Sequence, residues 1–384
     1  MQNFTYNIPT IINFGIDQLS HLADLRESGD RVLYVYGGGS IKANGLYDRS
    51  MKILRDSGLE VYELSGIEPN PRIQTIREGV NICRSKMVDM VLAVGGGSVI
   101  DSAKVIAAGA CYDGDPWDLV IKPELISECL PIYAVLTIAA TGSEMDTFAV
   151  ISDLTKNEKW GTWSEFFAPR MSILDPTLTY SVPRRQTSAG VADIMSHTLE
   201  NYFNNEKGAY LQARLAEGIL KTLINYGPIA LEQPDNYEAR ANLMWCSSLA
   251  INGLLSCGAN VGWGVHPMEH ELSAFYDITH GEGLAILTPH FLEFALNKDN
   301  VWKYVEYARN VFGITEGTEM EMARDAIRAT KDFFKRMRLP STLSELGIDD
   351  EYFDIMAEKA AAGCFDTFVN LTKDDIISIF RASL

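Results

Sequence analysis

The stretch VLAVGGGSVIDSAKVIAAGA, residues 91–110, decides the fold of the first part of the chain. It runs from a short series of β-forming residues through a glycine-rich turn into a pattern typical of a helix. The turn consists of Gly95, Gly96, Gly97 and Ser98. Such glycines let the backbone approach a pyrophosphate, and the following helix N-terminus offers N–H groups and a positive dipole end. Ser98 is expected to cap this helix, with Asp101 as its capping-box partner.

On its own this turn supports nucleotide binding and a purely steric need for glycine equally. A second turn of the same kind lies in VLYVYGGGSIKANG, residues 32–45, where three glycines and Ser40 again follow apolar β-formers. Two such turns on one sheet favour dinucleotide binding. Neither matches the G-x-G-x-x-G fingerprint, so the sequence predicts a variant dinucleotide fold.

The turn at Gly37 also indicates which dinucleotide binds. Backbone N–H, hydroxyl and cationic groups favour the 2'-phosphate of NADP(H), and Gly37, Gly38, Ser40 and Lys42 supply them. Glu63 lies about where an ordinary Rossmann domain places its ribose-binding acid and would favour NAD. The fingerprint that would place Glu63 at the ribose is missing. The prediction therefore follows the residues of the turn, and we expect NADP(H).

The pattern of apolar residues changes from strand-like to helical near residue 180. Before it, runs at 31–36, 89–94 and 131–138 read as strands buried on both faces, which predicts a parallel sheet covered by helices. After it, apolar residues recur at helical spacing with few strand signals. We therefore expect an α/β dinucleotide-binding domain at 1–180 and an all-helical metal and substrate domain at 181–384.

Composition excludes several classes of partner. A formal net charge of −18 and 47% hydrophobic residues argue for a folded protein that binds neither nucleic acid nor an anionic membrane. We expect no export signal, and no long uncharged apolar run occurs. The six cysteines are scattered without CxxC spacing, which favours reduced thiols in the cytoplasm.

Histidines and one aspartate recur at helical spacing in the second half of the chain. Asp193 and His197 are four residues apart, His266 and His270 repeat that spacing, and His280 follows. A carboxylate with imidazoles and no thiolate suits a catalytic Fe(II) or Zn(II). A cap or surface pair is the alternative for Asp193 and His197 alone, but burying the whole group among apolar residues is costly unless its members are paired or bind a metal.

The surroundings of these histidines also indicate the substrate. Between Arg240 and Lys298 there is no lysine or arginine, whereas phosphate or carboxylate substrates call for a cation. An uncharged, mostly apolar small molecule fits unless cations arrive from other segments. The two remaining histidines, His21 and His290, are interpreted as structural.

Taken together, these motifs resemble the iron-containing (group III) alcohol dehydrogenase family. The resemblance covers nearly the whole chain, and it is carried by PTIINFG (9–15), GGGSVIDSAK (95–104), TGSEMD (141–146), ILDPTLTYSVP (173–183), AGVADIMSHTLENYF (189–203) and MEHELSAFYDITHGEGLAIL (268–287). The segments YGGGSIKANGLYD, GIEPNP and ITEG resemble its NADPH-dependent butanol dehydrogenase and aldehyde reductase branch. The resemblance implies a dehydroquinate-synthase-like fold and a homodimer.

The resemblance also implies roles for individual residues. It implies that the metal ligands are Asp193, His197, His266 and His280, and that His270 is a proton-relay residue. It implies that the cofactor is held by Gly37, Gly38, Ser40, Asn70, Gly95, Gly96, Gly97, Ser98, Thr137, Thr141, Lys159 and Leu178. Asp146 and Phe148 depart from the smaller or uncharged residues of the family, which leaves the size of the pocket open.

The expected activity is reversible hydride transfer between NADP(H) and a small aldehyde or alcohol such as butyraldehyde or butanol. The metal would act as a Lewis acid on the carbonyl oxygen. A dehydroquinate-synthase-like metal lyase with bound NAD is the alternative, although its phosphorylated substrate would demand lysines or arginines beside the ligands. A non-catalytic nucleotide-binding protein is a third interpretation.

Overall fold

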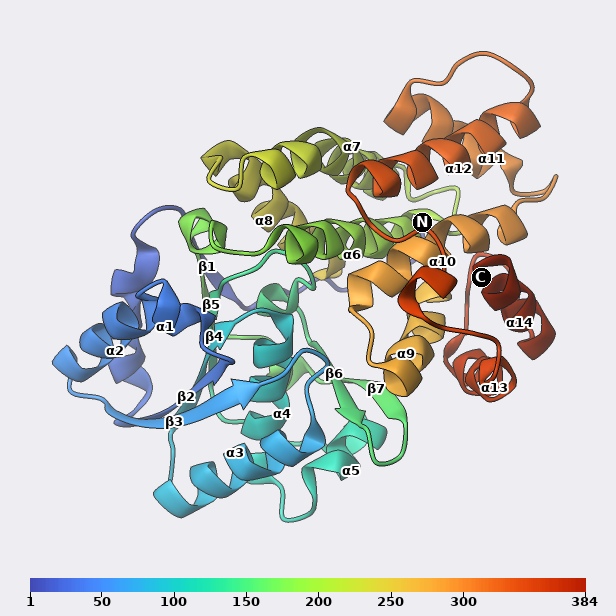
Figure 1. Ribbon diagram of the computed structural model, residues 1–384. Helices are drawn as coiled ribbons and strands as arrows, with labels where there is room; N and C mark the ends of the chain where they lie inside the picture. The colour runs from blue at the N-terminus through green and yellow to red at the C-terminus, as the bar shows by residue number, and fades with distance from the viewer. The chain divides into compact units, whose positions relative to one another are not determined.

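The three predicted strands lie in one parallel sheet of six. The computed structural model describes residues 1–384, and its sheet has the strand order β1-β8-β5-β4-β2-β3 with every pair parallel (Figure 1). Its strands are β1 (Ile11–Phe14), β2 (Arg31–Gly37), β3 (Glu60–Ile67), β4 (Met90–Gly95), β5 (Ile132–Leu136) and β8 (Met171–Leu174). A separate antiparallel hairpin consists of β6 (Phe148–Asp153) and β7 (Glu158–Trp163).

Both faces of the sheet are covered, as the apolar runs predict. Alternate side chains of one strand enter different cores: Leu33 and Val35 face one, while Val32 and Tyr34 face the other. Helices α3 and α4 pack on the first face, and α2 with η1 on the second (Figure 1). The helices among these strands are η1 (Gln18–Ser28), α1 (Ser40–Ala43), α2 (Leu46–Asp56), α3 (Ile73–Lys86), α4 (Gly97–Cys111) and α5 (Pro116–Ile121), with short 3-10 turns η2 (Pro123–Leu125), η3 (Ser143–Met145), η4 (Glu165–Phe167) and η5 (Pro176–Thr179).

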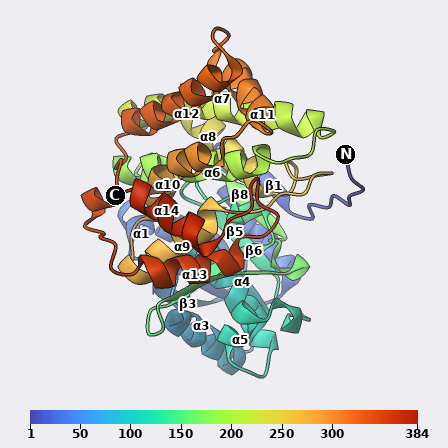
Figure 2. The same ribbon diagram turned by 90° about the vertical axis from the view of Figure 1, so that its right-hand side faces the viewer.

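The rest of the chain is helical, in agreement with the predicted fold class. Its elements are α6 (Arg184–Tyr202), α7 (Tyr210–Glu232), α8 (Tyr237–Ile251), α9 (Val265–Tyr276), α10 (His280–Ala295), α11 (Val301–Tyr307), η6 (Ala308–Phe312), α12 (Glu319–Arg336), η7 (Ser344–Leu346), α13 (Phe353–Gly363) and α14 (Lys373–Ala382). Helix α10 packs against α6, α9 and α14, and α13 packs against α9 and α14 (Figures 1 and 2). None of the helices combines the length and the apolar character needed to cross a bilayer.

The chain divides into two units, and their bounds differ from the predicted ones in two segments. The α/β unit contains Asn7–Val182 and Asp235–Ser248, and the helical unit contains Met1–Tyr6, Pro183–Pro234 and Leu249–Leu384. The crossing after Val182 lies close to the predicted boundary near residue 180.

Side-chain contacts explain the first exchanged segment, most of α8. Met244 is fully buried in the hydrophobic core that also contains residues of β4, β5 and α4. Ser247 Oγ accepts the amide of Ala140 at 3.1 Å, and Ser248 Oγ donates to Glu144 at 2.5 Å. The other exchanged segment is the N-terminus, where the amide of Gln2 donates to the carbonyl of Gly258 at 2.8 Å. Helical periodicity predicts an element but not the partner on which it packs.

The expected cap of α4 is also corrected. Gly96 is the N-cap residue, and Ser98 lies inside the helix with no capping hydrogen bond. Asp101 instead accepts Ser143 Oγ at 2.6 Å and the amide of Val150 at 2.9 Å. The carboxylate of Asp101 therefore links α4 to the chain after β5. The local pattern around Ser98 does not predict these long-range hydrogen bonds.

Candidate functional site

Helix α6 brings Asp193 and His197 into the interior of the helical unit. The helix is buried continuously from Thr187 to Tyr202, so its polar side chains need partners. Some of them bond to the helix itself, as Thr198 Oγ1 does to the carbonyl of Ile194 at 2.7 Å. Asp193 and His197, on one face of α6, are 3% and 5% exposed.

Helices α9 and α10 bring His266 and His280 to the same place. His266 lies in the first turn of α9, and His280 is the first residue of α10 after a connection of three residues, 277–279. Gly281 allows α10 to approach α6, because an added Cβ there would overlap the backbone of Ala189. Glycine at this position is therefore required to seat His280 against α6.

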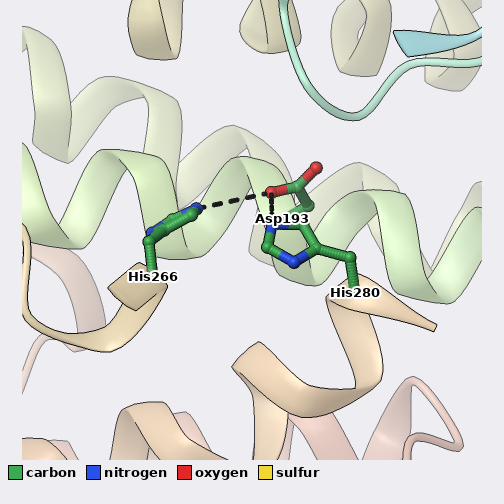
Figure 3. Close-up of side chains that lie close together, drawn as sticks. All are labelled: Asp193, His266 and His280. Carbon is green, nitrogen blue, oxygen red and sulfur yellow. Dashed lines mark ion pairs between the residues drawn. The ribbon is translucent and has the colours of Figure 1, made fainter. Parts of the chain in front are cut away.

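Two of the four predicted metal ligands, His266 and His280, converge on a carboxylate oxygen of a third, Asp193 (Figure 3). The Nε2 atoms of His266 and His280 each lie 3.8 Å from Asp193 Oδ1. One ligand atom from each of these three residues lies within 4.8 Å of the others. Ligand atoms about 2.1 Å from a shared ion in a tetrahedral site lie about 3.4 Å apart. The spacing fits a divalent cation.

Hydrogen bonding gives an independent test of that fit. Asp193 Oδ1, His197 Nδ1 and His266 Nε2 are buried, and none of them has a hydrogen-bond partner. A buried polar atom without a partner costs free energy, and these three face one another. Carboxylate and imidazole atoms in this arrangement are suitable donors for Fe(II) or Zn(II). The residues present therefore fit the metal that their spacing predicts.

The two other predicted residues of this site border the cluster. His197 Nδ1 lies 3.5 Å from Asp193 Oδ1, and its ring stacks on that of His266 with centroids 4.6 Å apart. His270 has its ring centroid 5.7 Å from that of His280, and these two form a second close group with Glu269. His21 and His290 belong to neither group.

The charges of the cluster favour a cation. Burial opposes the ionisation of Asp193, but the imidazoles of His197, His280 and His266 outweigh it and hold the pKa of Asp193 well below its usual range. Burial lowers the pKa of His197 to about 3, against the opposing effect of Asp193. His197 is thus kept neutral, which is the form of imidazole that binds a metal.

Two buried glutamates that the sequence analysis missed hold the outer nitrogens of the histidines. Glu200 accepts the amides of Gly264 and Val265 at 2.6 and 2.8 Å and contacts His266 Nδ1. Glu269 is fully buried and contacts His280 Nδ1. Burial disfavours the charge of His266, but Glu200 and Asp193 outweigh it and raise the pKa of His266 to about 9. One signal was available, because Glu200 follows Asp193 by seven residues and so lies on the same helix face.

The predicted cofactor residues gather in the α/β unit at the carboxyl ends of the parallel strands. Gly37 ends β2 and Gly95 ends β4, Thr137 follows β5, and Thr137 donates its amide to the carbonyl of Gly95 at 3.0 Å. The same edge carries Gly38, Ser40, Asn70, Gly96, Gly97, Ser98, Thr141 and Leu178. This edge is where open α/β sheets bind dinucleotides.

Lys159 reaches this group from the hairpin. It pairs with Ser152 across β6 and β7, and the amide of Ser152 donates to the carbonyl of Pro71, the neighbour of Asn70, at 2.8 Å. Lys159 is buried, and so is Leu178 in η5. All twelve predicted cofactor residues therefore belong to one unit.

Packing decides the role of glycine differently in the two turns. An added Cβ at Gly95, Gly96 or Gly97 would overlap Val99, Ile138 and Thr141 respectively, so the steric explanation accounts for this turn by itself. At Gly38, in contrast, no atom lies within 4 Å of an added Cβ. Gly38, in the turn after β2, is thus a glycine that the protein's own packing does not require.

The carboxylate of Glu63 accepts hydrogen bonds from two tyrosines. Its carboxylate accepts Tyr36 Oη at 3.1 Å and Tyr47 Oη at 2.9 Å, and Lys42 Nζ lies 4.9 and 4.7 Å from the centroids of these two rings. The turn that predicts NADP(H) therefore has a cation beside it. The acid that would favour NAD, Glu63, is exposed and accepts hydrogen bonds from both tyrosines.

The two departures at positions 146 and 148 have different surroundings. Asp146 is buried and accepts Lys104 Nζ at 2.6 Å and the amide of Phe148 at 2.9 Å. Phe148 is 48% exposed. The carboxylate of Asp146 therefore neutralises a buried lysine.

The chain is similar to known proteins over its whole length. Residues 9–176 match the family model described as iron-containing alcohol dehydrogenase, and residues 187–384 match that of the C-terminal region of the Fe-containing alcohol dehydrogenase family. NADH-dependent butanol dehydrogenase B of Clostridium acetobutylicum is 55% identical, with 100% of both chains covered. The NADPH-dependent aldehyde reductase YqhD of Escherichia coli is 40% identical over 94% of this chain and 93% of its own.

A solved structure shows the same architecture. The crystal structure of NADH-dependent butanol dehydrogenase A from Thermotoga maritima superposes with a TM-score of 0.96 at 38% identity, and the match covers 100% of this chain and 99% of the other. Two family models and a full-length relative above half identity thus point to the same family. The chain belongs to the iron-containing alcohol dehydrogenase family.

Proposed function

We propose that this alcohol dehydrogenase transfers a hydride reversibly between NADP(H) and a small uncharged aldehyde or alcohol, such as butyraldehyde or butanol, in a metal-dependent reaction. The observation that carries the proposal is the convergence of His266 and His280 on Asp193, with buried atoms that have no hydrogen-bond partner. Asp193, His197, His266 and His280 would hold Fe(II) or Zn(II). The ion, when bound, supplies a Lewis acid for the carbonyl oxygen.

The protein's own residues would bind the cofactor and move the proton. The glycine turns would hold the dinucleotide, with Asn70, Thr137, Thr141, Lys159 and Leu178 along it. His270, whose ring lies 5.7 Å from that of His280, would relay a proton between the alkoxide and solvent. The product is the neutral alcohol.

Two opposing observations bear on the choice of NADP(H). The relative from C. acetobutylicum is named for NADH, and the one from E. coli is named for NADPH. In this chain the turn after β2 carries no carboxylate, Glu63 is bonded to Tyr36 and Tyr47, and Lys42 is exposed beside them. These local features favour the 2'-phosphate. Because they belong to this chain, whereas the cofactor names belong to its relatives, we propose NADP(H).

Few cationic side chains are available near the cluster, which favours an uncharged substrate. No lysine or arginine occurs between Arg240 and Lys298, and Arg185 is taken up by a bidentate pair with Glu282 at 2.6 and 2.7 Å. Family membership and this scarcity of cations argue against the dehydroquinate-synthase-like lyase. A homodimer in the cytoplasm remains our prediction.

The proposal is tested by oxidation of NADPH and NADH with butyraldehyde, on protein reconstituted separately with Fe(II), with Zn(II) and with no metal. We expect metal-dependent turnover and a higher kcat/KM with NADPH. The Asp193→Asn variant should lose bound metal and turnover together, by roughly 100-fold or more, because it removes the charge on which both imidazoles converge. Full activity of the metal-free protein would rule out the proposal, and a preference for NADH would rule out its cofactor part alone.

A further inference from the structure

We infer that Glu200 and Glu269 are positioning residues that fix which nitrogen of His266 and of His280 is available to a metal. The inference rests on the proposed function, since it concerns the same metal centre. Each carboxylate contacts the Nδ1 atom of one histidine, and the Nε2 atom of each ring lies 3.8 Å from Asp193 Oδ1. The two imidazoles are therefore held from outside by one buried acid each.

Glu200 serves two purposes with its two oxygens. Its Oε1 accepts the amides of Gly264 and Val265, which are the first N–H groups of α9. Its Oε2 contacts His266 Nδ1. The carboxylate thus sets the start of α9 and the orientation of the imidazole in its first turn, although it belongs to a different helix.

Glu269 makes the corresponding contact for His280. It is fully buried, one oxygen accepts Ser273 Oγ, and the other contacts His280 Nδ1. Gly283 permits this approach of α10 to α9, because an added Cβ would lie 2.8 Å from Glu269 Cγ. A side chain at position 283 would push His280 away from its acid.

The chemistry of imidazole connects these contacts to metal binding. A carboxylate only accepts hydrogen bonds, so a histidine beside it donates Nδ1–H. In the neutral form that binds a metal, an imidazole that donates from Nδ1 has no other N–H, and therefore Nε2 carries the lone pair. His266 Nε2, buried without a hydrogen-bond partner, is the atom that this arrangement exposes to Asp193. The acids would thus select the tautomer that binds a metal.

Glutamine substitutions separate this role from packing. Glu200→Gln keeps an oxygen for the amides of Gly264 and Val265 but presents an NH2 group to Nδ1. His266 would then have to accept at Nδ1 and carry its proton on Nε2, where it blocks ligation. Glu269→Gln should act in the same way on His280. Glu271→Gln is the matched control, because Glu271 is also a buried acid of α9 and its Oε2 atom lies 3.8 Å from Lys359 Nζ.

The experiment measures Zn(II) affinity by competition with a chromophoric chelator, and the visible absorption of the Co(II)-loaded protein. We expect roughly 10- to 100-fold weaker binding and shifted Co(II) bands for Glu200→Gln and Glu269→Gln, with metal-free circular dichroism unchanged and Glu271→Gln like the parent. Equal affinities for parent and variants would overturn the inference, as would an equal loss in the control. A parent protein that binds no metal would instead contradict the proposed function.

Discussion

At the scale of single residues, Glu144 is a buried acid of the α/β unit whose surroundings oppose its ionisation. It is fully buried, its Oε1 accepts Ser248 Oγ, and its Oε2 has no hydrogen-bond partner. Burial raises the pKa of Glu144 from 4.5 to about 7; the hydrogen bond from Ser248 and the charge of Lys104 oppose this rise, and Asp146 adds to it. The native protein therefore holds a proton that the unfolded chain has already lost within this pH range.

This pKa predicts a falling stability between about pH 4.5 and 7, because the native state binds more protons there than the unfolded state. The contribution is at most about 3 kcal/mol. Glu144→Gln should remove this pH-dependent contribution. The free energy of unfolding of the variant should therefore increase relative to that of the parent as the pH rises from 5 to 8. Urea unfolding of both proteins at the two pH values measures the difference. Asp101, whose pKa burial raises to about 6, remains in both proteins as a common background. Parallel pH profiles would contradict the prediction.

Sequence spacing predicts some site residues and misses others for a physical reason. Asp193 and His197 share a helix face at four-residue spacing, and the structure brings Asp193 together with His266 and His280. Glu200 and Glu269 follow equally regular spacings. Which acid meets which imidazole depends on how α6, α9 and α10 pack, and periodicity within one helix does not contain that information.

At the scale of elements, the two glycine turns should respond oppositely to a methyl group. Gly97→Ala should lower the unfolding temperature, at a cost of about 1–3 kcal/mol, because the new Cβ overlaps Thr141. Gly38→Ala should leave the unfolding temperature unchanged, since nothing lies within 4 Å. If the dinucleotide passes Gly38, this variant should raise the KM for NADPH. Thermal melts and steady-state kinetics of the two variants provide the measurement.

Each variant serves as the control for the other. A normal melting temperature for Gly97→Ala would contradict the packing argument. An unchanged KM for both cofactors in Gly38→Ala would remove that glycine from the binding site. The sequence predicts both turns and their strands, but only the positions of Thr141 and Ile138 reveal which turn needs glycine for its own packing.

At the scale of the whole molecule, α8 couples a late part of the sequence to the early sheet. Met244→Ala should destabilise the protein by about 2–5 kcal/mol, because it removes a fully buried side chain from the core beside α4. Hydrogen exchange should then rise in peptides from β4 and α4. Glu238→Ala, at an exposed position in the first turn of α8, is the control and should leave exchange unchanged. Faster exchange confined to the helical unit would contradict this assignment of α8.

The division between the units was the least predictable part of the fold. Strand signals end near residue 180, and the chain does cross after Val182. The segment Asp235–Ser248 has the same helical pattern as its neighbours in the sequence. Its composition therefore gives no reason to assign it to the α/β unit. Its serines and Met244 acquire a partner only when the loop after β5 is in place.

This return of the chain has a consequence for synthesis on the ribosome. The α/β unit lacks part of its core until Ser248 has been made, and the helical unit includes both Met1–Tyr6 and the last residue, Leu384. A nascent chain that stops after Val182 has all six strands of the sheet but leaves the surface that receives Met244 uncovered. The surface that receives Met244 therefore stays exposed while residues 183–248 are translated, and slow elongation over these residues would prolong that exposure.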